Sequence, residues 1–103
     1  MATIRVIMCH RPHGQRRYVN ISNVYSEDAD FINRNNILVS IEEIPIFHMA
    51  VYFDYGKREN GEPKEWTEFS KGRSCQDTLK TGLDMVRKLM AEMQSEESMG
   101  NEG

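Results

Sequence analysis

An alternation of apolar and polar side chains between residues 47 and 55 constrains the fold of this chain more than any other feature. The apolar row consists of Phe47, Met49, Val51, Phe53 and Tyr55. The opposite row consists of His48, Ala50, Tyr52 and Asp54. Side chains of a β-strand point alternately to the two faces of a sheet, so this segment predicts a strand with one apolar face. A second element must cover that face.

A helical apolar stripe near the C-terminus can supply this cover. It consists of Leu79, Gly82, Leu83, Val86, Leu89, Met90 and Met93. Ser74 precedes the stripe as an N-cap, and Asp77 follows three residues later, as in a capping box. We therefore expect a helix from Cys75 to about Gln94 that packs on the sheet. A glycine within the stripe, at position 82, indicates a close approach between helix and strand.

The remaining segments complete an α+β fold. Apolar and β-branched residues predict further strands at 3–9, 17–24, 37–43 and 65–69, and a short helix capped by Ser26 at 26–34. Asn60 and Gly61 predict a hairpin turn before the last strand. The expected order is β-β-α-β-β-β-α, in a mostly antiparallel sheet of about five strands with the long C-terminal helix packed on one face.

Length and composition indicate one domain. The chain has 103 residues, of which 39% are hydrophobic and 28% charged, with a net charge of -3. These values are typical of a globular protein and leave no room for a second core. We expect a single α+β domain at 1–94 and a disordered acidic tail at 95–103, where the composition is polar and has no apolar period.

Two cysteines, Cys9 and Cys75, stand far apart with no others around them. This usage predicts reduced thiols and a cytoplasmic location. No long apolar stretch follows Met1, so we expect no signal peptide. No run of apolar residues is long enough to cross a bilayer, and we expect no membrane association.

Cys9 also belongs to the one local cluster of soft metal ligands, together with His10 and His13. A structural zinc site needs four ligands, and no paired cluster follows in the sequence. The carboxylates show no spacing that metal-dependent or glycosidic chemistry requires. We expect neither a metal nor another cofactor.

Cys75 is the one candidate for nucleophilic catalysis. It is expected in the first turn of a helix, where the helix dipole lowers the pKa of a thiol. A nucleophile of this kind needs a histidine brought near it, and His48 is the candidate partner. No device for binding an oxyanion accompanies them. The prediction is that the protein is not an enzyme, with a small cysteine-dependent enzyme as one alternative.

Basic residues form two candidate sites for anions. Lys71, Arg73 and Ser74 precede the last helix, whose free N–H groups favour a phosphate, although the spacing is not that of a nucleotide-binding loop. Arg16 and Arg17 belong to a basic hairpin at 11–17, of the mixed basic and aromatic kind that binds single-stranded nucleic acid. A nucleic-acid-binding accessory protein that uses this hairpin and the loop at 71–73 is therefore the second alternative.

The absence of catalytic groups favours a small non-catalytic protein-binding or inhibitory module, of the kind that phages and mobile elements often encode. Aromatic and arginine side chains dominate the binding energy of protein interfaces. The predicted partner-binding residues are Tyr52, Tyr55, Trp66, Arg58, Glu59, Arg16 and Arg17. The partner is expected to be a protein, and an uncovered strand face would also favour a homodimer.

Overall fold

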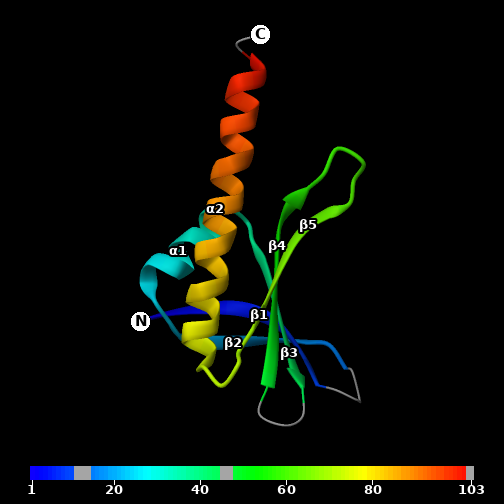
Figure 1. Ribbon diagram of the computed structural model, residues 1–103. Coiled ribbons are helices and arrows are strands. Elements are labelled where there is room, and N and C mark those ends of the chain that lie inside the picture. The colour runs from blue at the N-terminus through cyan, green and yellow to red at the C-terminus, as the bar shows by residue number, and fades with distance from the viewer. Residues whose placement is uncertain (11–14, 45–47, 102–103) are drawn as a thin grey trace.

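The computed structural model describes the backbone of residues 1–10, 15–44 and 48–101. The elements are β1 (Ala2–His10), β2 (Arg17–Val24), α1 (Ser26–Arg34), β3 (Leu38–Ile44), β4 (His48–Lys57), β5 (Pro63–Phe69) and α2 (Cys75–Asn101). This order of strands and helices is the predicted one (Figure 1). Phe47, the first residue of the predicted apolar row, lies outside the described residues.

The five strands form one sheet in the order β2-β1-β3-β4-β5. Three neighbouring pairs are antiparallel, as expected, but β1 and β3 are parallel, with Ile7 opposite Ser40. The sheet is therefore mixed, and the expectation of an antiparallel sheet is only partly correct. The reason is that α1 carries the chain past β1, so that β3 pairs with β1 instead of with β2.

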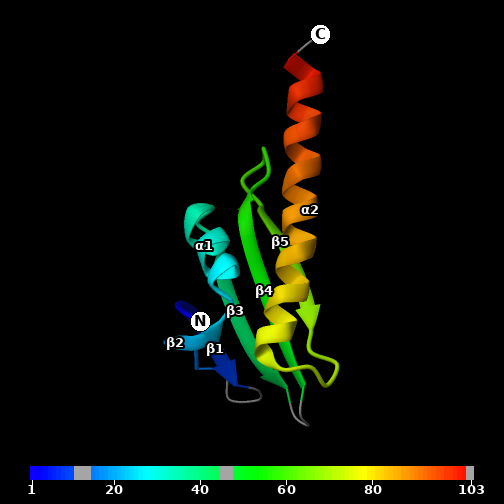
Figure 2. The ribbon, with the colours of Figure 1, turned by 90° about the vertical axis from the view of Figure 1, so that its left-hand side faces the viewer.

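Both helices pack on the same face of the sheet, here called the helix face (Figures 1 and 2). Alternate strand residues and the α2 stripe bury their apolar side chains in one cluster. Its most deeply buried members are Val6, Val24, Val39, Ile41, Val51, Phe53, Leu79, Leu83 and Val86. Because the burial of apolar surface is the main stabilising term in folding, this layer between sheet and helices holds the domain together.

Gly82 lies where α2 approaches the sheet most closely. A Cβ atom built at this position would overlap the ring of Phe53, at 2.7 Å from Cζ, and would lie 3.2 Å from Cβ of Glu68. Both distances are shorter than ordinary carbon contacts. The prediction that a glycine in the stripe marks close packing is therefore confirmed.

The two helices begin differently. Ser74 caps α2 as predicted, because its Oγ accepts a hydrogen bond of 3.2 Å from the N–H of Asp77. The predicted cap of α1 is wrong: Tyr25 is the N-cap, and no side chain caps this helix. The carbonyl of Tyr25 accepts the N–H groups of Asp28 and Ala29 at 3.0 Å each. Ser26 is instead the first helical residue.

The last helix is longer than its apolar stripe. α2 runs to Asn101, beyond the end near Gln94 that the stripe predicts. No proline interrupts residues 95–101, so the backbone can continue in the helical conformation after the apolar period has ended. The division of the chain into a domain at 1–94 and a disordered tail at 95–103 stays a prediction.

Candidate functional site

The second face of the sheet, here called the open face, is covered by neither α1 nor α2. Three of its side chains are large, apolar and about half exposed: Tyr18 at 60%, Leu38 at 45% and Phe69 at 50%. Among the described residues only Met1, at the chain end, is a more exposed side chain of this kind. Exposed apolar groups gathered on one face are typical of an interaction surface.

The register of the sheet places these side chains on one face but in different rows, with Tyr18 on β2 at one edge and Phe69 on β5 at the other. Side chains of directly opposed residues lie on the same face, so each row across the sheet belongs to one face. One row of the open face consists of Tyr18, Ile7, Ser40, Tyr52 and Thr67. Leu38 belongs to the next row, with Asp54 and Glu65, and Phe69 belongs to the row on the other side, with Glu42 and Ala50.

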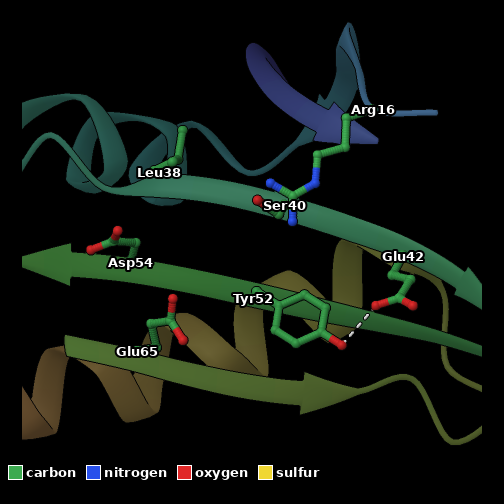
Figure 3. A pocket seen from close by; sticks show the side chains of 7 residues that line it. All are labelled: Arg16, Leu38, Ser40, Glu42, Tyr52, Asp54 and Glu65. Carbon is green, nitrogen blue, oxygen red and sulfur yellow. Dashed lines mark hydrogen bonds between the residues drawn. The ribbon is translucent and has the colours of Figure 1, made fainter. Parts of the chain in front are cut away.

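A shallow hollow of about 480 Å³ lies on the open face over β3, β4 and β5 (Figure 3). Its walls are formed by Arg16, Leu38, Ser40, Glu42, Tyr52, Asp54 and Glu65. The hydroxyl of Tyr52 donates a hydrogen bond of 2.8 Å to Oε2 of Glu42 and so fixes the ring across the floor. The Arg16 side chain extends from the start of β2 to the neighbourhood of Ser40 (Figure 3). An adjoining hollow of about 250 Å³ continues toward β1.

Charged side chains of both signs lie on the open face. Arg5 lies on β1 and stacks on the ring of Tyr18 at 4.2 Å, whereas the Arg16 side chain extends over β3 into the hollow that Asp54 and Glu65 also line (Figure 3). The anions Asp54 and Glu65 lie on β4 and β5, directly opposite each other in the register. Within the described residues neither carboxylate forms an ion pair. Like charges at opposed positions destabilise a sheet, so these two carboxylates do not stabilise the isolated chain.

The predicted partner-binding residues divide between the two faces. Tyr52 and Arg16 lie on the open face, whereas Tyr55 and Trp66 lie on the helix face and pack against the core. Tyr52 and Tyr55 are three positions apart in one strand, and an odd separation places side chains on opposite faces. The indole N–H of Trp66 donates to Glu68 at 3.3 Å. These aromatic residues therefore do not form one continuous patch.

The other predicted contacts lie at the ends of the strands. Arg58 and Glu59 belong to the exposed turn between β4 and β5, and Arg17 is an exposed residue at the start of β2. Tyr55 and Arg58 border a separate hollow of about 200 Å³ between this hairpin and α2. That hollow also contacts Met93. The sequence interpretation did not assign Leu38, Phe69 or the opposed carboxylates to a binding surface. The period-two alternation of their strands nevertheless indicates that they share one face.

In the predicted anion site, Arg73 and Ser74 already form hydrogen bonds within the protein. The Arg73 side chain donates to the carbonyls of Ser70 and Phe69, to Thr81 and to Glu68, at 2.7–3.1 Å. Lys71 is exposed with a positive φ of 47°, and Ser74 already caps α2. A phosphate would have to compete with these bonds of Arg73. The anion site and the nucleic-acid alternative stay predictions, and residues 11–14 of the basic hairpin lie outside the described residues.

Cys75 occupies the expected first turn of α2, but its environment differs from the expected one. Its thiol is partly buried, and this burial raises its pKa above the ordinary value, whereas the helix-dipole argument predicts a lowered value. A raised pKa leaves less of the nucleophilic thiolate at neutral pH. Both cysteines are free thiols. In the part of the chain that the structure describes, no group of three potential ligands could hold a metal ion, and His13 lies outside that part.

Comparisons with known proteins leave the chain without an assigned family. No family model, no curated protein and no solved structure matches it. Among the described residues, no helix combines the length and the apolar character needed to cross a membrane.

Proposed function

We propose that this protein is a small non-catalytic protein-binding or inhibitory module, of the accessory type that a phage or mobile element encodes, and that it binds its partner through the open face. The observation that carries this proposal is the exposure of Tyr18, Leu38 and Phe69 across the one sheet face that no helix of the described chain covers. Exposing these groups to water costs free energy that a partner would recover by covering them.

The composition of the open face supports a protein as the partner. Tyrosine and arginine contribute most to binding energy in protein interfaces, and Tyr18, Tyr52, Arg5 and Arg16 lie here. Leu38 and Tyr52 stand among charged side chains on this face, and such a mixture occurs in non-obligate protein interfaces, which are about as apolar as the rest of a protein surface. The carboxylates of Asp54 and Glu65 would repel the phosphates of a nucleic acid laid on this face.

Affinity capture with surface variants tests this proposal. The full chain, immobilised as wild type and as the double variant Tyr18→Asp and Phe69→Asp, is offered untagged copies of itself and an extract of its source cells. We expect the wild type to retain a protein in stoichiometric amount and the double variant to lose it, because both substitutions place unpaired charges in the interface.

The control is Met93→Asp, which introduces one negative charge, as each single substitution of the double variant does, beside the separate hollow between the hairpin and α2. Retention by this variant, together with loss by the double variant, supports the open face. Equal loss from Met93→Asp would assign binding to the other hollow. If the wild type retains no protein of either source, the proposed function is wrong.

A further inference from the structure

We infer that the occupant of the open face is a second copy of this chain, packed sheet to sheet about a twofold axis that runs along β3. This inference rests on the proposed function and names the partner for the same surface. Its basis is the division of charge along one band of the face, with Arg5 on β1 and the carboxylates of Asp54 and Glu65 on β4 and β5.

A twofold axis parallel to β3, placed between two stacked sheets, reverses the order of the strands. With the order β2-β1-β3-β4-β5, β1 of one copy then lies over β4 of the other, and β2 lies over β5. The basic end of this band in each copy meets the acidic end of the band in its partner, twice by symmetry. A twofold axis across the strands would instead place basic end over basic end. The charge pattern thus selects one arrangement.

The register identifies the side chains that meet. Arg5, Leu38, Asp54 and Glu65 belong to one band across the open face, because Ile7 is opposite Ser40 and Asp54 is opposite both Leu38 and Glu65. Rotation about β3 brings Leu38 of the two copies together and places Arg5 of each copy over Asp54 and Glu65 of the other. A cation supplied in this way relieves the repulsion between the two opposed carboxylates. Glu42, also on the open face of β3, then lies opposite Glu42 of the other copy, and Arg16 lines the same hollow as Glu42.

Apolar contact accompanies the charges in this arrangement. The same rotation places Tyr18 of one copy over Thr67 of the other and places Ile7 over Tyr52, so exposed apolar and aromatic surface on each copy becomes covered. Stacked sheets lie about 10 Å apart and cross at an angle of about 30°, a separation that side chains of these sizes fill.

The size of the face indicates a weak dimer. Five strands at about 4.8 Å spacing and about 23 Å length give each copy a flat sheet area of roughly 550 Å². The additional surface of the protruding side chains is not included in this value. An interface of standard size buries about 800 Å² on each partner, and smaller ones belong to transient complexes. We therefore expect a dissociation constant in the micromolar range.

Sedimentation velocity on the full, purified chain, from about 5 to 500 µM, measures this association. We expect Arg5→Glu and Asp54→Arg each to weaken dimer formation about tenfold or more, because these two residues face each other directly and each reversal occurs twice in a symmetric dimer. An equimolar mixture of the two variants should associate within about threefold of the wild type, because every reversed charge again faces its opposite.

Arg17→Glu and Glu62→Arg are the matched controls, since they change the net charge equally at exposed positions outside the proposed contact. Both should dimerise like the wild type. The inference is overturned by a wild type that is monomeric at all concentrations, by controls that weaken association as much as the test variants, or by a mixture that does not recover.

Failure of this inference can be distinguished from failure of the proposed function. A purified chain that stays monomeric, while its open face still captures a different protein in the affinity experiment, removes the second copy as occupant and leaves the protein-binding function standing. A chain that retains neither itself nor another protein removes both.

Discussion

The two faces of the sheet are formed by alternate residues of the same strands, yet they have opposite physical character. On the helix face Val51 and Phe53 are completely buried in the apolar cluster that also contains Leu79, Leu83 and Val86 of α2. On the open face Leu38 and Phe69 are about half exposed and stand among arginines and carboxylates. One face therefore stabilises the fold, whereas the other is available for binding without being needed for folding.

Removal of a large side chain from each face gives the widest expected difference. Phe53→Ala should lower the free energy of unfolding by about 3–5 kcal/mol, because it leaves a cavity under α2. Phe69→Ala, on the open face, should lower it by less than about 1 kcal/mol, since its ring is already half exposed. Urea denaturation measures both values, and similar losses would contradict the assignment of the two faces.

Removal of a charged side chain should also change stability differently on the two sides of the sheet. On the helix side Asp28 is 1% exposed and forms an ion pair of 3.1 Å with Arg87, whose side chain is 33% exposed. The second carboxylate oxygen of Asp28 has no hydrogen-bond partner, so Arg87 is essential to this buried charge.

Arg87→Ala should therefore lower the free energy of unfolding by about 2–4 kcal/mol. This loss is smaller than is usual for breaking a fully buried ion pair, because the arginine is partly exposed. Arg87→Lys retains the charge and should recover part of the loss. Thermal denaturation of both variants at neutral pH provides the measurement. Equal stability of Arg87→Ala and wild type would show that the pair contributes nothing.

The close contact at Gly82 can be tested by whether Gly82→Ala raises or lowers the stability of the protein. In an exposed helix, Gly→Ala increases stability by about 1 kcal/mol. Here the added methyl group would meet the ring of Phe53, so Gly82→Ala should decrease stability by about 1–3 kcal/mol. The same urea titration measures this change, and a stabilised variant would show that α2 can move away from the sheet at little cost.

The smallest expected effect comes from the opposed carboxylates of the open face. Glu65→Gln removes the repulsion with Asp54 and should raise the free energy of unfolding of the monomer by about 0.2–0.5 kcal/mol. Dilute samples at low salt are required, since salt screens the repulsion. A clear loss of stability would indicate that Glu65 has a favourable contact within the monomer, against the division between the faces.

Much of the fold was predictable because local patterns decide it. Alternation gave the strands around Val39 and Val51, helical spacing gave α2, and the small size of Gly82 indicated where helix and sheet meet. The parallel pairing of β1 with β3 was not predictable in this way. Strand order depends on contacts between segments distant in the sequence, and the hydrogen-bonding groups of β1 are equally suited to either direction of partner.

The candidate site was predicted less well than the fold. Tyr52 and Arg16 belong to the open face, as a surface role requires, but Tyr55 and Trp66 were grouped with them although strand alternation separates the faces. Leu38 was interpreted only as part of a strand. Its exposure follows from its place on the strand face opposite that of Val39, the face that the predicted helix does not cover.

The amino-acid sequence alone determined the type and approximate extent of each element, because backbone periodicity, capping and turn formation depend on residues that are close together in the chain. Only the tertiary structure decided which strands are neighbours and which side chains and charges of different strands lie next to one another on the uncovered face. Those properties arise when side chains far apart in the sequence are brought into one row. No local pattern contains that information.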